Sequence, residues 1–332
     1  MDPLEKKMQT ILIIRFSSIG DVVLTSPVVR ALKQQGGYCI HYLVKKKFKN
    51  AIENNPFIDQ IFYLEDAGIK DVLLKERYDI TVDLQNNLKS FKMRQGLSKT
   101  TLIVNKENLK KTLLVRAGID LLKGEHIVAR YFKTVKKIGI KDDGNGLDFF
   151  IPEGFKITSC KLPIDLSNPY LAWVIGASYP KKMLPLNHIL EVCKGLNVPI
   201  LLIGGSMDKN NGDEIVRSSK GTNLYNLCGE LSLEESSYVL KRSALVLSND
   251  TGLMHIAAAF NKKIISFWGC TKPSLGMSPY RADEKSVMLL SPTNEEPCSK
   301  LGNRCKSSKN GCIGDLDTEK ITASLNELLK SK

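Results

Sequence analysis

A turn near residue 250 carries residue types suited to binding an anion. It reads Ser-Asn-Asp-Thr-Gly-Leu-Met-His-Ile-Ala-Ala-Ala over residues 248–259, directly after a short apolar run typical of a buried strand. Asn249, Asp250 and Thr251 are candidates to cap the helix that the alanine-rich run predicts. The N-terminus of a helix offers free N–H groups and a positive dipole end, which suit phosphate. An ordinary strand–helix junction has the same pattern, so both interpretations stay open.

A second set of candidate residues follows the first apolar run of the chain, Thr10–Phe16. It consists of Ser17, Ser18, Gly20 and Asp21. Ligands of open α/β sheets bind at this end of a strand. Gly20 permits a tight turn, and the serines could cap the helix or bind a hydroxyl. Asp21 falls in the first helical turn, where its carboxylate could take a proton from an attacking hydroxyl. The alternative is that Asp21 only complements the helix dipole, which would also lower its pKa and weaken it as a base.

Further turns that follow apolar runs add candidates for binding a nucleotide. After residues 170–175 come Ser178, Lys181 and Lys182, and the two lysines could place positive charge on a diphosphate. Asp208 follows a glycine pair, where an acid commonly accepts hydrogen bonds from ribose hydroxyls. Thr271 could close the same pocket. A solvated lysine pair and plain turns are the alternatives.

Cysteines near the C-terminus raise the question of a metal site. Cys298, Cys305 and Cys312 are evenly spaced, with six residues in each gap, and could hold zinc with Cys270 or a water as the fourth ligand. These gaps do not match the close pairs of common zinc sites, so the sequence favours no metal site here. We also expect no cofactor.

Alternating strands and helices must position these groups, which predicts an α/β fold with mostly parallel sheets. We expect strands at residues 10–16, 39–44, 61–64, 78–84, 101–104, 170–175, 199–203, 244–247 and 263–267, and a short segment at 224–226. We expect helices at residues 20–34, 67–76, 89–97, 126–138, 185–195, 213–219, 233–242 and 318–329, with a loop and a helix in 106–122.

Glycines and prolines interrupt this alternation at residues 141–169, which is typical of a linker. The sequence therefore predicts two Rossmann-like domains, residues 1–160 and 161–332, that face a central cleft. The last helix could pack back on the first domain.

The composition is that of a globular protein, but the charge is unusual. The chain has 332 residues, of which 42% are hydrophobic and 25% charged, and its net charge is +13. Such a charge favours anionic partners, namely nucleic acid, an acidic membrane surface or phosphorylated small molecules, although a solvated lysine-rich surface is the simpler alternative. No apolar run approaches the ~18 residues of a membrane span. The charged N-terminus lacks a secretory signal, so we expect a cytoplasmic protein with reduced thiols.

Taken together, the motifs resemble one family, the ADP-heptose:lipopolysaccharide heptosyltransferases of glycosyltransferase family 9. The resemblance rests on Arg15-Phe-Ser-Ser-Ile-Gly-Asp-Val-Val-Leu-Thr-Ser-Pro27, Asp83-Leu-Gln-Asn-Asn-Leu-Lys-Ser90, Gly176-Ala-Ser-Tyr-Pro180 with Lys182 and Pro185, the turn at 248–259, and the ending from Pro297 through Cys312. It covers nearly the whole chain in the right order, and the first motif and the turn at 248–259 are specific. One residue departs from the family, because Leu184 stands where a tryptophan is usual.

The resemblance implies a GT-B fold and an inverting, metal-independent transfer of heptose from ADP-heptose to a hydroxyl of a lipid A–core glycolipid. The acceptor would lie at the inner face of the cytoplasmic membrane, where the enzyme would bind peripherally. Asp21 would be the general base, with Ser17, Ser18 and Gly20 lining the cleft. The donor would be held by Ser178, Lys182, Asp208, Asp250, Thr251, Gly252 and His255.

Three alternatives remain at this level, one of which is a nucleotide-sugar binder without catalytic activity, although the intact Asp21 and Lys182 argue against it. The same fold could transfer another nucleotide sugar, or the basic chain could bind nucleic acid. No helix-turn-helix, zinc-finger or RNP signature supports nucleic-acid binding, so we expect no nucleic-acid partner.

Overall fold

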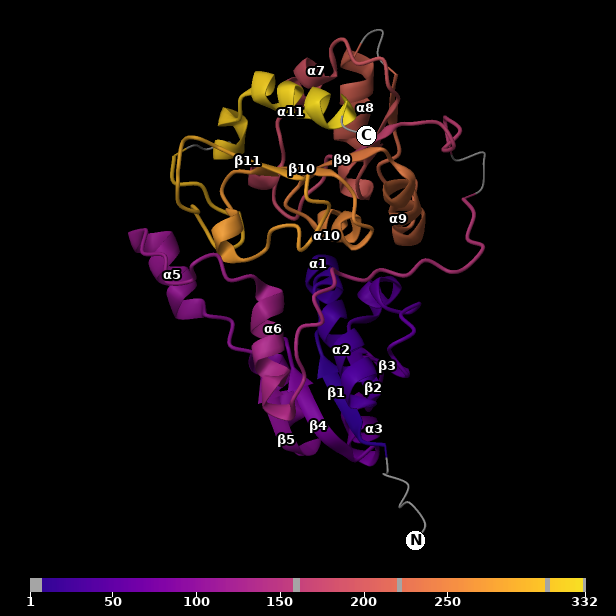
Figure 1. Cartoon of the computed structure of the whole chain (residues 1–332), viewed down its shortest axis with the longest axis vertical. Coiled ribbons are helices and arrows are strands. Elements are labelled where there is room, and N and C mark those ends of the chain that lie inside the picture. Colours follow the sequence, from indigo (N-terminus) through magenta and orange to yellow (C-terminus); the bar gives the residue numbers. More distant parts are fainter. Residues whose placement is uncertain (1–7, 158–161, 220–222, 308–310, 331–332) are drawn as a thin grey trace. The chain divides into compact units, whose positions relative to one another are not determined.

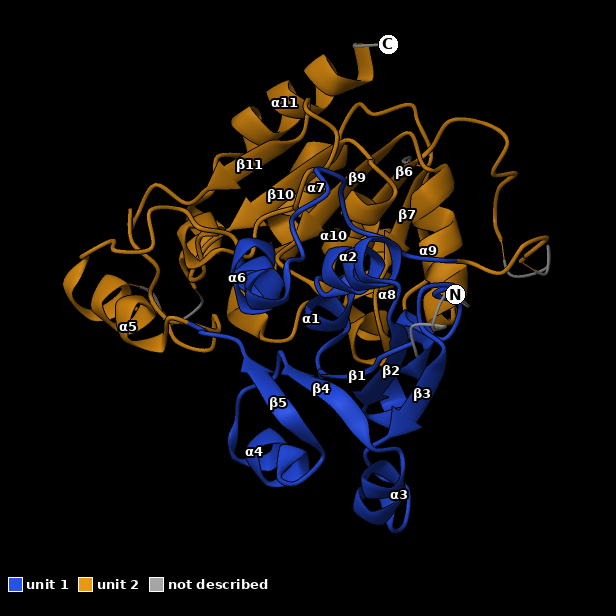
Figure 2. Ribbon diagram, turned by 60° about the horizontal axis from the view of Figure 1, so that its bottom comes forward, with its two compact units in different colours: residues 1–106, 127–150 blue, residues 107–126, 151–332 orange. Residues whose placement is uncertain are grey.

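A computed structural model describes residues 8–157, 162–219, 223–307 and 311–330. The chain divides into two compact units (Figure 2). The first comprises residues 1–106 and 127–150, and the second comprises residues 107–126 and 151–332. The predicted domain boundary between residues 160 and 161 lies outside the described residues. The segment 107–126, which the sequence analysis assigned to the first domain, is grouped with the second unit.

The first unit is built on a parallel sheet of five strands in the order β3-β2-β1-β4-β5 (Figure 1). The strands are β1 (Thr10–Ile14), β2 (Cys39–Val44), β3 (Gln60–Tyr63), β4 (Tyr78–Asp83) and β5 (Ser98–Ile103). Residues 11–14 of β1 are fully buried, as expected for a central strand with both faces covered. The carboxyl ends of β1 and β4 therefore lie side by side, and both carry polar residues.

The helices of the first unit differ from the predictions mainly at the start. The single helix predicted for residues 20–34 is two helices, α1 (Ile19–Val23) and α2 (Ser26–Gly36). Pro27 lies in the first turn of α2, where it needs no hydrogen-bond partner but cannot continue a preceding helix. The others are η1 (Lys46–Ala51), α3 (Ile69–Lys75), α4 (Leu88–Arg94), α6 (Ile127–Val135) and η2 (Lys136–Ile138).

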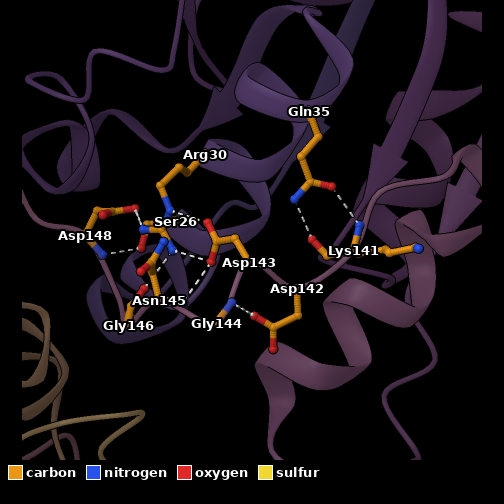
Figure 3. Close-up of polar contacts among 10 residues, drawn as sticks. All are labelled: Ser26, Arg30, Gln35, Lys141, Asp142, Asp143, Gly144, Asn145, Gly146 and Asp148. Carbon is orange, nitrogen blue, oxygen red and sulfur yellow. Dashed lines mark hydrogen bonds and ion pairs between the residues drawn. The ribbon is translucent and has the colours of Figure 1, made fainter.

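The first part of the predicted linker, residues 141–148, is bound to α2 by ion pairs and hydrogen bonds (Figure 3). Arg30 forms ion pairs with Asp143, at 2.7 Å between Nε and Oδ2, and with Asp148. The backbone N–H of Asp148 donates to Ser26 Oγ at 2.8 Å, and Gln35 exchanges two hydrogen bonds with the backbone of Lys141. Residues 141–148 thus belong to the first unit.

The second unit contains a parallel sheet of six strands in the order β11-β10-β9-β6-β7-β8. The strands are β6 (Leu171–Val174), β7 (Ile200–Ile203), β8 (Leu224–Asn226), β9 (Leu245–Asn249), β10 (Ile264–Trp268) and β11 (Val287–Leu290). Strand β11 was not among the predicted strands, because it is a short edge strand in which Met288 and Leu290 are exposed.

The second unit also contains helices, and several of them pack against this sheet. They are α5 (Asn108–Ala117), η4 (Pro180–Lys182), α7 (Leu186–Cys193), η5 (Ser206–Asp208), α8 (Lys209–Ser218), α9 (Leu233–Arg242), α10 (Gly252–Ala259), η6 (Pro273–Leu275), η7 (Cys312–Asp315) and α11 (Thr318–Lys330). The buried face of α11, which includes Ile321 and Leu325, packs in the same core as α7 and the strands of this unit. Among the described residues, none of the helices has the length and apolar character needed to span a membrane.

A buried ion pair at the carboxyl end of β4 makes a testable contribution to stability. Asp83 is fully buried, pairs with Arg94 of α4, and accepts hydrogen bonds from the backbone N–H groups of Gln85 and Asn86. Because Arg94→Met would leave this charge without its cation, we expect a loss of about 3 kcal/mol in the free energy of unfolding. Urea unfolding followed by circular dichroism measures the loss. Lys92→Met, an exposed change on the same helix, is the control, and equal effects of the two changes would contradict the prediction.

Candidate active-site residues

Asp21 lies in the first turn of α1, as the sequence predicts, and its carboxylate is held from two sides. Arg15 forms an ion pair with it, at 2.5 Å between Nη2 and Oδ1. Ser18, the N-cap of α1, donates to Oδ2 through its backbone N–H at 2.9 Å and its hydroxyl at 3.0 Å. The side chain of Asp21 is 24% exposed, so a substrate hydroxyl could still reach it.

Arg15 is itself fixed by the backbone. It is buried, and it donates to the carbonyl oxygen of Ser17 at 3.0 Å and to that of Leu84 at 2.6 Å. Burial alone would raise the pKa of Asp21, but the charge of Arg15 and the hydrogen bonds from Ser18 outweigh it and lower this pKa. Asp21 is therefore a carboxylate at neutral pH. The ion pair between Arg15 and Asp21 was not predicted from the sequence, although Arg15 is the first residue of the motif that ends at Pro27.

The residues around Asp21 complete a small polar site at the end of β1. Ser17 is partly exposed, Ser18 is exposed and Gly20 is buried within α1. Lys106, which follows β5, is close enough for the charges of Arg15 and Asp21 to act on its ammonium group, and burial lowers its pKa. Lys106 thus adds a second positive charge that acts on this carboxylate, and the sequence alone does not single it out.

In the second unit, α10 begins at Gly252 as predicted, with Thr251 as its N-cap. Thr251 Oγ1 accepts a hydrogen bond from the backbone N–H of Leu253 at 3.1 Å, which confirms one of the three capping candidates. Asn249 has a different role. It ends β9, and its side chain accepts from the N–H of Leu184 and donates to the carbonyl oxygen of Ile175. It thereby joins the turn that carries Lys182 to the end of β9.

Lys182 and Asp250 form an ion pair directly before α10. The distance from Lys182 Nζ to Asp250 Oδ2 is 2.6 Å, and Thr271 Oγ1 donates to the same oxygen at 2.8 Å. The side chains of the pair are only 12% and 11% exposed. Three separate turns, after β6, β9 and β10, thus bring a lysine, an aspartate and a threonine together. Lys182 is not the solvated lysine of the simpler interpretation, whereas Ser178 on the same turn is exposed.

Asp208 and His255 are mostly enclosed by protein. The carboxylate of Asp208 accepts from the N–H of Gly205 at 2.8 Å, and burial raises its pKa. A Cβ atom on Gly176 would lie 2.1 Å from Asp208 Oδ2, so the close approach requires glycine there. His255 lies in α10 and is 2% exposed. Contacts of these two residues with a donor stay predictions.

An apolar pocket of about 410 Å³ adjoins the turn that carries Lys182. Pro180 and Met183 line it from that turn and Ile215 lines it from α8, while Asn211 and Glu214 supply polar groups. The sequence alone does not indicate this pocket, because its walls come from elements that only the fold brings together. Its lining suits a flat, partly apolar ring with hydrogen-bonding edges.

Four cysteines of the second unit gather in one cluster. The sulfur atoms of Cys270, Cys298, Cys305 and Cys312 all lie within 4.8 Å of one another. The sequence analysis named Cys270 as a possible fourth member but favoured no metal site on the basis of spacing.

Comparisons with known proteins connect these sites to one family. The model of glycosyltransferase family 9 (heptosyltransferase) matches residues 68–309. The lipopolysaccharide heptosyltransferase 1 of Campylobacter coli is 26% identical over 79% of this chain and 84% of its own length.

Solved structures agree in fold. A family 9 glycosyltransferase from Veillonella parvula superposes with a TM-score of 0.79 at 18% identity, covering 98% of both chains. The E. coli heptosyltransferase WaaC, solved with ADP, superposes with a TM-score of 0.71 at 19% identity, covering 96% of this chain and 100% of that one. WaaC has also been solved with ADP-2-deoxy-2-fluoro heptose. The fold is therefore GT-B, and this chain is a glycosyltransferase that belongs to family 9, the heptosyltransferase family.

Proposed function

We propose that this enzyme transfers heptose from ADP-heptose to a hydroxyl group of the lipopolysaccharide inner core. The observation that carries the proposal is the pairing of Lys182, Asp250 and Thr271 at the N-terminus of α10, where a cation and the first backbone N–H groups of the helix suit a diphosphate. The family supports heptose as the sugar, and the ligands of WaaC support ADP as its carrier. The apolar pocket beside Lys182 offers a place for the adenine ring.

The proposed reaction is a single displacement that inverts the anomeric carbon. The acceptor oxygen forms a bond to the anomeric carbon while the bond from that carbon to the β-phosphate oxygen breaks. Asp21 takes the proton of the acceptor hydroxyl, and the bonding electron pair leaves with ADP. Lys182 and the N–H groups at Thr251 and Gly252 stabilise the charge that develops on ADP, so the transfer itself needs no metal ion at the diphosphate. We assign Asp208 to the ribose and Ser178, Asp250 and His255 to the rest of the donor.

The acceptor is proposed to be a lipid A–core glycolipid at the inner face of the cytoplasmic membrane. The net charge of +13 favours peripheral binding to such a phosphorylated, acidic surface. We assign contacts with the acceptor sugar to Ser17 and Ser18, which precede Asp21 in the same turn and are partly exposed and exposed, respectively.

A donor panel tests the proposal. Purified protein is given ADP-heptose, other ADP-sugars and UDP-sugars together with a heptose-free inner-core acceptor, and products are identified by mass spectrometry and NMR. We expect turnover with ADP-heptose and inversion of the anomeric configuration. Turnover of another donor with ADP-heptose inert would contradict the donor assignment, and retention of configuration would contradict the single displacement.

A further inference from the structure

The four clustered sulfur atoms have the spacing of ligands around a single metal ion. The distances are 3.9 Å from Cys298 Sγ to Cys305 Sγ, 3.9 Å from Cys298 Sγ to Cys312 Sγ, and 3.8 Å from Cys312 Sγ to Cys270 Sγ. Thiolates at about 2.3 Å from a tetrahedral zinc ion stand roughly 3.8 Å apart. A disulfide would require about 2.05 Å, so these thiols are not cross-linked.

We infer that Cys270, Cys298, Cys305 and Cys312 form a tetrathiolate site for one structural metal ion, with zinc as its occupant. Four sulfur ligands in a tetrahedron favour zinc or iron over hard cations such as magnesium. No open coordination position remains when four thiolates bind, which is the mark of a structural rather than a catalytic site.

The residues around the four sulfur atoms include a cation and a hydrogen-bond donor, which would stabilise negatively charged thiolates. Four thiolates around a divalent ion carry a net charge of about −2. Lys272 is 1% exposed and donates to the carbonyl oxygen of Ser291 at 2.8 Å. Negative charge on Cys270, Cys298 or Cys312 would attract its ammonium group. The side-chain amide of Asn294 lies 3.5 Å from Cys298 Sγ and donates to it. Such donors commonly surround metal-bound sulfur.

The cluster joins three parts of the second unit. Cys270 follows β10, Cys312 begins η7 immediately before α11, and Cys298 and Cys305 lie between them in a stretch that forms no helix or strand in its described part. The N–H of Cys298 donates to the carbonyl oxygen of Cys270 at 2.9 Å. A bound ion would therefore hold this irregular stretch against the end of β10.

The stretch held in this way packs against the proposed donor site. A Cβ atom on Gly302 would lie 2.5 Å from Lys182 Cδ and 3.3 Å from Thr271 Cγ2, and one on Gly311 would lie 3.0 Å from the carbonyl oxygen of Lys181. Lys300 also donates to the carbonyl oxygen of Asn108 in α5. The ion would thus fix the segment that packs against Lys182. Its importance for the donor site rests on the proposed function, whereas the metal site itself does not.

The test measures metal in the full-length protein. Purified under reducing conditions without added metal, the wild type is analysed by inductively coupled plasma mass spectrometry and by thiol titration before and after chelation. We expect about one equivalent of zinc per chain. Cys305→Ser and Cys298→Ser should lose most of it, while Cys193→Ala, which removes a buried thiol outside the cluster, should retain it. Cobalt substitution should give the absorption of a tetrahedral tetrathiolate in the wild type and not in Cys305→Ser.

If a variant fails to fold, the metal stoichiometry and the cobalt spectrum of the wild type still test the metal site. One equivalent of iron bound by the same thiols would support the site and replace zinc as its occupant. A wild type that contains no metal and does not take up zinc or cobalt would overturn it, as would disulfides among these cysteines in the freshly reduced protein. Metal content is measured without substrate, so failure of the proposed heptose transfer would leave this result interpretable.

Discussion

Asp21→Asn is expected to lower kcat by about 10²- to 10⁴-fold, the range typical of a lost general base. Asparagine has nearly the same shape and can still accept a hydrogen bond from Ser18, but it cannot take a proton from the acceptor. Steady-state kinetics with ADP-heptose and a heptose-free inner-core acceptor measure the change. Because Asp21 is assigned to the acceptor proton and not to the donor, the affinity for ADP-heptose should remain close to that of the wild type.

Asp66→Asn is a suitable control, since Asp66 is an exposed carboxylate of the same unit. The pH profile adds a second measurement. The active form of Asp21 is the carboxylate, and its pKa is lowered. The loss of wild-type activity that protonation of Asp21 causes should therefore occur below about pH 3.9, the ordinary pKa of an aspartate. The stability that the ionised form contributes is present above the unfolded-state pKa and is lost as pH falls through the folded-state pKa. Undiminished turnover by Asp21→Asn would remove Asp21 from the mechanism.

Local patterns were sufficient to predict much of the fold. The strand at 39–44 and the helix at 233–242 match their predicted bounds, because an apolar run or a capped amphipathic segment specifies each of them locally. Differences from the predictions arose where tertiary contacts decide the outcome. The segment 107–126 joins the second unit through contacts such as Lys300 with Asn108, which are almost two hundred residues apart in the chain.

The same distinction applies to the candidate sites. Asp21 and Thr251 could be placed at helix starts, since each follows a recognisable strand and lies within one turn of its helix. Their partners could not be placed in the same way. The pairing of Lys182 with Asp250 joins two turns separated by more than sixty residues, and Cys270 precedes the other clustered cysteines by a whole strand and a long loop. Spacing rules for zinc ligands describe local pairs and miss such a cluster.

Lys182→Ala is the second change expected to have a large effect, with kcat/KM for ADP-heptose falling by about 10²- to 10³-fold, as for other groups that stabilise developing charge. Lys182 is nearly enclosed and pairs with Asp250, whereas its neighbour Lys181 has no assigned role at the donor. Lys181→Ala is therefore the matched control and should retain most of the activity. Equal losses in the two variants would show that general positive charge, and not this ion pair, serves the donor.

Part of the loss in Lys182→Ala should come from Asp250 and not from the missing cation alone. Asp250 is 11% exposed, so without Lys182 its carboxylate keeps only the hydrogen bond from Thr271 among the contacts described above, and its charge repels the diphosphate. Removing that charge as well, in Lys182→Ala/Asp250→Asn, should restore about tenfold of the lost kcat/KM relative to the single variant. Losses that simply add in the double variant would show that the two residues act independently, so that Asp250 would serve the donor only through the direct contact assigned to it above.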